Sequence, residues 1–335
     1  MSERKAAIAA FLETAGWTAA TKIALAGDAS FRRYSRLTHQ NASAMLMDAP
    51  PPQEDVRPFL AIARCLHGLG FSAPRILAAD IAAGLLLLED FGDDTYTRLL
   101  AKGADEAALY ALAIDVLIAL HRQFTPSKAP DLPPYDDARL LTEASLLVDW
   151  YLPAITGEPT FASVRESYLD LWRRLLPLAR AVPSSLVLRD YHVDNLMRLE
   201  SRHGVAACGL LDFQDAVLGP VTYDLVSLLE DSRRDIDPQL VTTMYDRYLA
   251  AFPELDRDRF AASYAVLGAQ RHCKVIGIFT RLDRRDGKLR YLQHIPRLWR
   301  LIDRNLRHPA LAPLKEWLDR HIPVERRVMP KAASA

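Results

Sequence analysis

The hydrophobic pattern of this chain changes once, near Gly92, and this change limits the folds that the chain can adopt. Before Gly92, short apolar runs bounded by turn residues predict strands, and one segment with apolar residues at helical spacing predicts a helix. The N-terminal part is therefore expected to be a small sheet with one helix. The expected strands are Ile23–Ala26, Tyr34–Thr38, Ala44–Met47, Arg75–Ala79 and Gly84–Glu89, and the expected helix is Glu54–Leu69.

After Gly92, apolar residues recur at helical spacing over most of the remaining chain. Short strands are expected only around loops, at residues 186–188, 196–199 and 209–211. We therefore expect an α+β fold with two lobes. These are a small antiparallel-sheet N-lobe at residues 1–90 and a large, mainly helical C-lobe at residues 91–335, with a hinge at about residues 88–93. The residues from about Pro323 onward are expected to fray as a tail.

The charge and cysteine content limit the partners of the chain. It has 335 residues, with 42 Lys plus Arg and 42 Asp plus Glu, so it lacks the basic excess of a nucleic-acid-binding protein. The most apolar stretch, Ala107–Leu120, is broken by Asp115 and is too short to span a bilayer. The three cysteines form no C-x-x-C pair, as expected for idle thiols in a reducing compartment. We expect a cytoplasmic protein without nucleic-acid, membrane or obligate protein partners.

The strongest local signal is a loop that contains Asp190 and Asn195, flanked by two short apolar runs. A second carboxylate, Asp212, follows another apolar run downstream. Phosphoryl transfer needs these groups, because one carboxylate takes the proton of the attacking hydroxyl while another carboxylate and an amide hold Mg²⁺ on the nucleotide phosphates. We assign the catalytic role to Asp190 and the metal-binding role to Asn195 and Asp212. The cofactor is then Mg²⁺, and the co-substrate is ATP.

Each of these signals has an ordinary explanation when it stands alone. An Asp with an Asn five residues later occurs often by chance, and an Asp after a buried strand often caps a loop. The order of the three residues, after a strand-rich segment, favours a kinase over these explanations.

With these residues, the chain resembles the aminoglycoside phosphotransferase and choline kinase superfamily, which has a protein-kinase-like fold. The loop of that superfamily reads His-Gly-Asp-(Leu/Phe)-His-x-x-Asn. Here Leu188-Arg189 replaces His-Gly, whereas Asp190, His192 and Asn195 match. The segment Gly219–Leu225 also resembles the superfamily's Gly-Pro-x-x-Tyr-Asp-Leu, whose Asp is expected to brace the catalytic loop. The resemblance implies an ATP-dependent phosphotransferase with a small-molecule alcohol as acceptor.

The chain resembles one branch more closely, the anomeric kinases of N-acetylmuramate and N-acetylglucosamine in bacterial peptidoglycan recycling. This resemblance implies transfer of the ATP γ-phosphate to the C1 hydroxyl of the amino sugar. An anomeric hydroxyl is more acidic than an ordinary alcohol, so a carboxylate can serve as its base. The matching segments are Gly27–Tyr34, Met47–Pro52 with Glu54-Asp55, Arg189–His192, and Gln270–His272 through Arg285–Lys288.

The nucleotide is expected to contact backbone groups at two places. The turn at Asp28, Ala29 and Ser30 lies where a kinase folds a hairpin over the phosphates, and its N–H groups are the expected contacts. An ordinary hairpin turn also explains this segment, because it has a single glycine. The apolar seam at the end of the N-lobe is expected to bind adenine through backbone groups of Glu89 and Phe91.

The phosphate-binding lysine that a protein kinase carries on its third strand is absent from the strand expected at Ala44–Met47. Arg32 or Arg33 is the proposed replacement, since guanidinium binds phosphate well. The alternative is that both are solvated arginines of a hairpin.

A sugar site combines an aromatic face with groups that bond hydroxyls. Glu143, Trp150 and Tyr151 are spaced i, i+7 and i+8 in an expected helix at Ala138–Leu152, which places them on one face. We expect them to bind the acceptor, although an ordinary helix with core aromatics has the same pattern.

Three further residues are expected at the acceptor. The superfamily resemblance favours His192, which is otherwise a structural histidine of the loop. Arg271 and Lys274, together with Gln270, lie close in sequence on one expected helix. They are expected to meet the lactyl carboxylate of N-acetylmuramate, or else to be solvated.

Two other functions stay open. One is a kinase of the same fold for another small alcohol, such as an aminoglycoside, a choline-like alcohol or another sugar. A polycationic acceptor favours an acidic pocket, and Asp136, Asp137, Glu143 and Asp149 are available for it. The other is a non-catalytic, kinase-like binding module, which the missing lysine favours and the complete catalytic set opposes.

Overall fold

The computed structural model describes residues 3–25, 31–126 and 130–332. Internal contacts divide the chain into two compact units. The first unit is built from the chain up to Val116 together with Val193–Ala216, and the second from most of the remaining residues. This division differs from the expected lobe boundary at residue 90, which stays a prediction.

The first unit contains a five-stranded sheet with the order β1-β2-β3-β5-β4. Every neighbouring pair of strands is antiparallel. The expected sheet-rich N-terminal part is therefore confirmed. The strands are β1 (Thr21–Ala24), β2 (Arg33–His39), β3 (Ala42–Asp48), β4 (Ile76–Asp80) and β5 (Leu85–Glu89).

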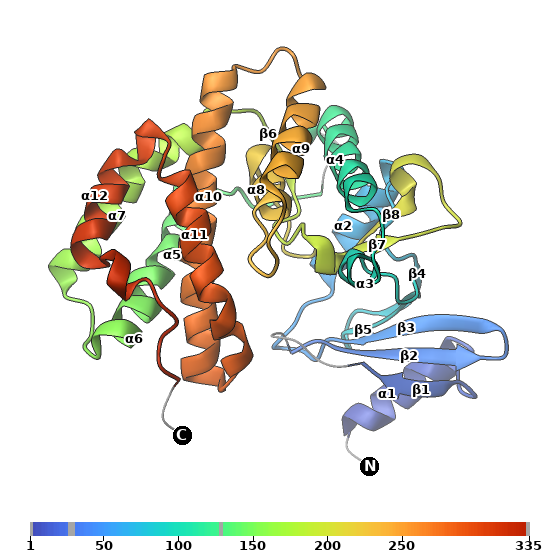
Figure 1. Cartoon of the computed structure of the whole chain (residues 1–335). Helices are drawn as coiled ribbons and strands as arrows, with labels where there is room; N and C mark the ends of the chain where they lie inside the picture. The colour runs from blue at the N-terminus through green and yellow to red at the C-terminus, as the bar shows by residue number, and fades with distance from the viewer. Residues whose placement is uncertain (1–2, 26–30, 127–129, 333–335) are drawn as a thin grey trace. The chain divides into compact units, whose positions relative to one another are not determined.

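This sheet is covered on both faces. The four leucines of Leu85–Leu88 are all buried, although successive side chains of a strand point to opposite faces. Helix α1 (Glu3–Thr14) contributes Phe11 to a cluster with Leu37 and other sheet residues. Figure 1 shows α1 below the sheet and helix α2 (Arg57–Gly68) above it. The burial of the leucine run thus follows from helices on both sides.

The first unit also contains a two-stranded antiparallel ladder of β7 (Leu196–Arg198) and β8 (Cys208–Leu210). A short 3₁₀ turn at Val193–Asn195 leads into β7. Helix α3 (Tyr96–Ala101) begins after Thr95, whose side chain caps it by accepting a hydrogen bond from the N–H of Arg98. Helix α4 (Glu106–Gln123) follows, and its residues from Leu117 onward belong to the second unit.

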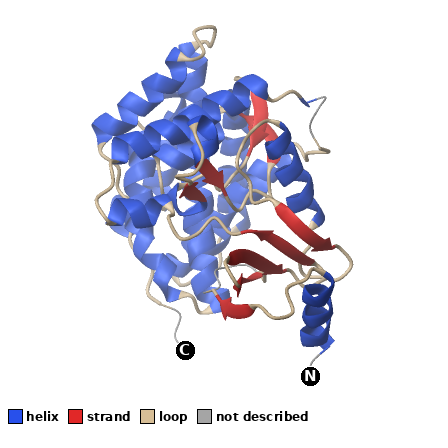
Figure 2. Ribbon diagram, turned by 90° about the vertical axis from the view of Figure 1, so that its right-hand side faces the viewer, coloured by secondary structure: helices blue, strands red, loops and turns tan. Residues whose placement is uncertain are grey.

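The second unit is mainly helical and is built around the 30-residue helix α10 (Arg257–Asp286). Figure 2 shows helices throughout most of the chain and the strands of the five-stranded sheet gathered together. Among the described helices, none is both long and apolar enough to cross a membrane. The other main elements of this unit are α5 (Asp137–Leu146), α6 (Leu152–Thr156), α7 (Ala162–Ala179), β6 (Ser184–Val187), β9 (Val217–Pro220), α8 (Thr222–Leu229), α9 (Pro238–Ala250), α11 (Ile295–Asn305) and α12 (Ala312–His321).

Helices α5 and α10 approach each other closely at Gly277. A Cβ atom at this position would lie 2.3 Å from the carbonyl carbon of Leu146, so a larger residue would push the helices apart. This close packing allows Glu143 on α5 to pair with Lys274 on α10 at 3.0 Å.

The expectation of a frayed C-terminal tail is wrong for the residues that the structure describes. The guanidinium of Arg327 pairs with Asp303 at 2.9 Å and with Asp319 at 2.6 Å. It also lies 5.5 Å from the ring centroid of Trp299. These partners come from α11 and α12, so the anchoring of the tail depends on tertiary packing and not on local sequence.

Candidate active site

The backbone of the predicted catalytic loop is held by Asp224, which lies in the first turn of α8. Its two carboxylate oxygens accept hydrogen bonds from the N–H of Leu188 at 2.6 Å and the N–H of Arg189 at 2.9 Å. Burial raises the pKa of Asp224 to about 7, and these two hydrogen bonds oppose that rise. The bracing role expected of Asp224 is therefore present in the structure, directly before Asp190.

Asn195 and Asp212 lie at the same end of the β7-β8 ladder. Asn195 immediately precedes β7, and Asp212 follows β8 by two residues. The carbonyl of Asn195 accepts a hydrogen bond from the N–H of Leu211 at 3.0 Å, which holds the two segments together. Phe213 stacks on Phe59 of α2 at 4.8 Å between ring centroids and so fixes the segment that carries Asp212.

These two side chains suit a magnesium ion. Their donors are an amide oxygen and a carboxylate oxygen, and Mg²⁺ is usually held by one or two protein ligands together with water and phosphate oxygens. Asp212 has φ of +57°, an uncommon value for a residue with a side chain. Such backbone conformations occur often at functional sites.

Asp190 belongs to the second unit, whereas Asn195 and Asp212 belong to the first, and the chain passes between the units after His192. The turn at Asp190 is tight, since its N–H donates to the carbonyl of Leu188 at 2.9 Å and its carbonyl accepts from the N–H of His192 at 3.2 Å. Asp190 and Asn195 are joined by four intervening residues of the chain.

Of the two arginines proposed to replace the missing lysine, Arg32 points toward acidic groups. Its Nη2 lies 3.4 Å from Asp212 Oδ1, and its Nε lies 3.7 Å from Glu54 Oε2. Burial lowers the pKa of Arg32, but the charges of Tyr34, Asp212 and Glu54 raise it by more, so the net shift is upward. Arg33 is exposed at the start of β2.

No role was predicted for Glu54 from the sequence, in which it is only part of a segment that resembles the amino-sugar kinases. In the structure it lies just before α2 and accepts a hydrogen bond from the N–H of Phe31 at 3.2 Å. No local sequence pattern predicts that Glu54 pairs with Arg32, because 22 positions separate the two residues. The predicted phosphate contacts at Asp28, Ala29 and Ser30 lie outside the described residues.

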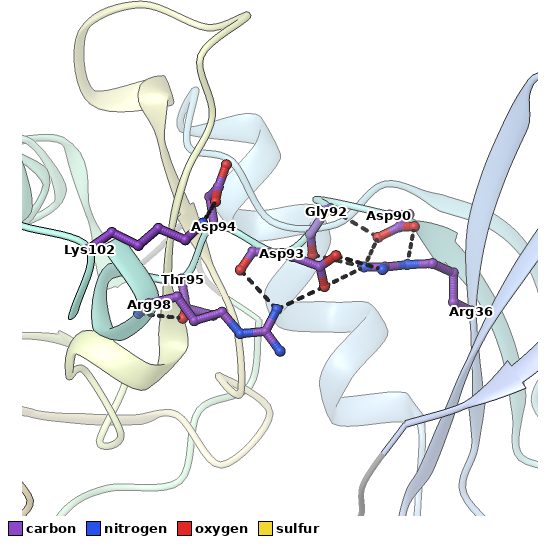
Figure 3. Close-up of polar contacts among 8 residues, drawn as sticks. All are labelled: Arg36, Asp90, Gly92, Asp93, Asp94, Thr95, Arg98 and Lys102. Atoms are coloured by element: carbon purple, nitrogen blue, oxygen red, sulfur yellow. Dashed lines mark hydrogen bonds and ion pairs between the residues drawn. The ribbon is translucent and has the colours of Figure 1, made fainter. Parts of the chain in front are cut away.

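The predicted adenine-binding seam is anchored by ion pairs. In Figure 3, Arg36 of β2 reaches Asp90, Gly92 and Asp93. Asp93 also pairs with Arg98 of α3 at 3.0 Å. The seam is thus tied both to the sheet and to the following helix.

Glu89 and Phe91 of this seam both contact Arg202. A carboxylate oxygen of Glu89 accepts from Arg202 at 2.5 Å, and the guanidinium lies 5.2 Å from the ring centroid of Phe91. The N–H of Glu89 donates to Arg75 at 2.8 Å, whereas the N–H of Phe91 has no protein acceptor in the part of the chain that the structure describes. A Cβ at Gly209 would lie 2.9 Å from the Phe91 ring, so this ring packs tightly on the β7-β8 ladder.

The predicted acceptor residues on the helix after Asp136 differ in burial and in their contacts. A π-helical turn at Leu147–Tyr151 follows α5, and its extra residue rotates the later side chains around the helix axis. Tyr151 is fully buried, and its hydroxyl bonds the Trp299 indole and carbonyls of the C-terminal tail. Trp150 is half-buried. Glu143 instead contacts Arg189, Lys274 and the hydroxyl of Tyr135.

The remaining predicted acceptor residues have different surroundings. His192 is buried, with its Nε2 at 3.2 Å from Arg233 Nη1. Arg271 is buried and donates to the hydroxyl of Ser227 at 2.8 Å. Lys274 lies between Glu143 and the hydroxyl of Tyr223, at 3.0 and 3.2 Å. Arg189 pairs with the same Glu143 carboxylate as Lys274 and was not predicted as a site residue.

Known proteins resemble this chain in sequence and in fold. The model of a phosphotransferase enzyme family matches residues 22–262. A protein of Caulobacter vibrioides named N-acetylmuramate/N-acetylglucosamine kinase is 42% identical over 97% of this chain and 99% of its own length. One of the same name from Pseudomonas aeruginosa is 42% identical over 88% of this chain and 87% of its own.

A likeness also exists among solved structures. A choline kinase from Streptococcus pneumoniae matches with a TM-score of 0.60 at 13% identity, over 93% of this chain and 100% of that one. This likeness confirms the expected fold, with its sheet-rich N-terminal part and its mainly helical remainder.

Proposed function

This chain belongs to the phosphotransferase enzyme family, and on that premise we propose that it transfers the γ-phosphate of ATP to the C1 hydroxyl of N-acetylmuramate, N-acetylglucosamine or both. The choice of acceptor is supported by relatives at 42% identity that carry those substrates in their names. The proposed chemistry is supported mainly by the conformation of the loop before Asp190. Asp224 holds this loop by accepting hydrogen bonds from two of its backbone N–H groups. The proposed use of ATP and the role in peptidoglycan recycling imply a cytoplasmic reaction.

In this mechanism, Asp190 accepts a hydrogen bond from the C1 hydroxyl and takes its proton as the sugar oxygen bonds to the γ-phosphorus. The bond between the γ-phosphorus and the bridging oxygen breaks, and ADP leaves. Asn195 and Asp212 would hold Mg²⁺, which neutralises the phosphate charge. Arg32 adds a positive charge close to Asp212, and Glu54 orients it.

Arg32 and Arg33 form a matched pair for testing the phosphate contact. Because Arg32 lies beside Asp212 and Arg33 is exposed, we expect Arg32→Ala to raise the KM for ATP by about 10–100-fold, the scale of one lost charge-assisted hydrogen bond. Arg33→Ala is the control and should change this KM by less than about 2-fold. Steady-state kinetics at saturating sugar gives both values. Wild-type KM values in both variants would remove the arginines from the ATP site.

The proposed function is tested by an ATP-consumption screen over a panel of sugars, aminoglycosides and choline-like alcohols. We expect turnover with N-acetylmuramate or N-acetylglucosamine and a phosphorus NMR signal of an anomeric phosphate in the product. The Asp190→Asn variant, purified in the same way, controls for contaminating kinases. Turnover only with a non-sugar alcohol would refute the proposal, and no ATP turnover with any acceptor would favour a binding module.

The acidic residues considered for a polycationic acceptor have partners within the protein. Asp136 caps α5 by accepting from the N–H of Arg139 at 3.0 Å. Asp137 pairs with Arg180 at 2.9 Å, and Asp149 pairs with Arg165 at 2.8 Å. These contacts give no support to an acidic pocket for a polycationic acceptor.

A further inference from the structure

Three donors from different parts of the second unit converge on the carboxylate of Glu143. Lys274 Nζ of α10 lies 3.0 Å from Oε1, and Arg189 Nη2 donates to the same oxygen. The hydroxyl of Tyr135 donates to Oε2 at 2.5 Å. The carboxylate therefore fixes both cations, and we call Glu143, Arg189 and Lys274 the charge triad.

The charge triad carries two positive charges and one negative charge in a shielded place. The side chains of Glu143 and Lys274 are 11% exposed and that of Arg189 is 16% exposed. Burial raises the pKa of Glu143, but Lys274, Arg189 and Tyr135 lower it by more, so the carboxylate stays ionised. Glu143 is thus shared between two cations, and the negative charge of Asp190 also acts on Arg189. The remaining exposure of the side chains leaves room for an anion to approach the two cations.

Lys274 retains hydrogen-bonding capacity. An ammonium group has three N–H donors, and the partners of Lys274 among the described residues are Glu143 and the hydroxyl of Tyr223. The Tyr223 ring lies 5.8 Å from Nζ, and the Tyr135 ring lies 5.7 Å from the Arg189 guanidinium carbon. The aromatic rings and Glu143 thus hold both cations in place. Among the described residues, two acceptors face the three N–H groups of Lys274, which leaves one N–H for a ligand.

Arg189 connects the charge triad to the reaction centre, because it is the residue directly before Asp190. Its φ is +70°, a left-handed value that suits glycine, and glycine is what the superfamily motif has at this position. The chain therefore maintains an arginine where the backbone favours glycine. A backbone outlier of this kind is a reason to look for a function of the side chain.

We propose that Arg189 and Lys274, positioned by Glu143, form a subsite for a carboxylate on the acceptor sugar. This inference rests on the proposed function. The group that binds there is the lactyl carboxylate of N-acetylmuramate, which N-acetylglucosamine lacks. Arg271 and Gln270 are not part of the subsite. Arg271 is 4% exposed and bonds Ser227, and the fully buried Gln270 donates to the carbonyl of Leu140 at 3.0 Å.

The test compares the two sugars in one enzyme. Lys274→Met removes the charge but keeps most of the side-chain length, and we expect it to raise the ratio of the KM for N-acetylmuramate to the KM for N-acetylglucosamine by about 10–100-fold. Lys274→Arg should keep this ratio within about 5-fold of wild type. Arg189→Gly should raise the ratio in the same way, because glycine adopts the observed φ while losing the guanidinium. The exposed Lys315, which pairs with Asp319 on α12, supplies the control Lys315→Met.

A measurement on the wild-type enzyme covers the case in which these variants fail to fold. The methyl ester of N-acetylmuramate has no negative charge, and its KM should exceed that of the free acid by about 10–100-fold. Equal KM values for ester and acid, or an unchanged ratio in folded Lys274→Met and Arg189→Gly, would overturn the subsite while leaving the proposed function intact. A wild-type enzyme that phosphorylates N-acetylglucosamine but not N-acetylmuramate also overturns the subsite alone. One that phosphorylates neither sugar overturns both proposals.

Discussion

Replacement of Asp190 by asparagine is expected to lower kcat by roughly 10²–10⁴, the usual contribution of a general base. Asparagine keeps the size of the side chain and one acceptor oxygen but cannot take the proton of the sugar hydroxyl. The Asp224 brace holds the backbone of Leu188 and Arg189, so the loop should keep its conformation in the variant. The KM for ATP and the melting temperature should stay close to wild type.

Asp194 provides a control for Asp190 within the same loop. Its carboxylate accepts a hydrogen bond from the hydroxyl of Thr97, which an asparagine oxygen can also accept. Asp194→Asn should therefore keep kcat within about 5-fold of wild type. An unchanged kcat in Asp190→Asn would remove this residue from the role of base.

The second large effect is expected for Asp212→Asn. This change removes the charge that would bind Mg²⁺ and that pairs with Arg32 at 3.4 Å, so kcat should fall by about 10²–10³ and the Mg²⁺ concentration for half-maximal rate should rise. A readout other than turnover is the thermal stabilisation of the protein by Mg²⁺ with ATP, which should decrease. Binding of a ligand to the folded state stabilises it by an amount that grows with the logarithm of the affinity, so the two readouts should change in the same direction.

Asp215 is the matched control for Asp212. It is an exposed carboxylate three residues later, and Gln214 donates to it at 3.1 Å as it does to Asp212 at 2.9 Å. Asp215→Asn should leave the Mg²⁺ dependence within about 2-fold of wild type. An identical Mg²⁺ dependence in wild type and Asp212→Asn would contradict the assignment of Asp212 as a metal ligand.

The strands and helices were predictable because their signals are local. The apolar runs at β2, β3 and β5 and the helical spacing of α2 and α4 involve residues within a few positions of one another. The same holds for the loop with Asp190 and Asn195, whose spacing is a property of one short segment. Helical periodicity did not predict the π-helical turn Leu147–Tyr151, which changes the angle between successive side chains.

The sequence by itself therefore determined the order of strands and helices, the catalytic loop and the likeness to a phosphotransferase family. Tertiary structure alone decided which distant charges meet. Arg32 lies beside Glu54 and Asp212, and Arg189 lies beside Glu143, a residue 46 positions earlier. No local pattern encodes such a pair, because its two members lie far apart in the sequence. The physical reason is that backbone propensity acts over a few residues, whereas burial and ion pairing act between surfaces that only the folded chain brings together.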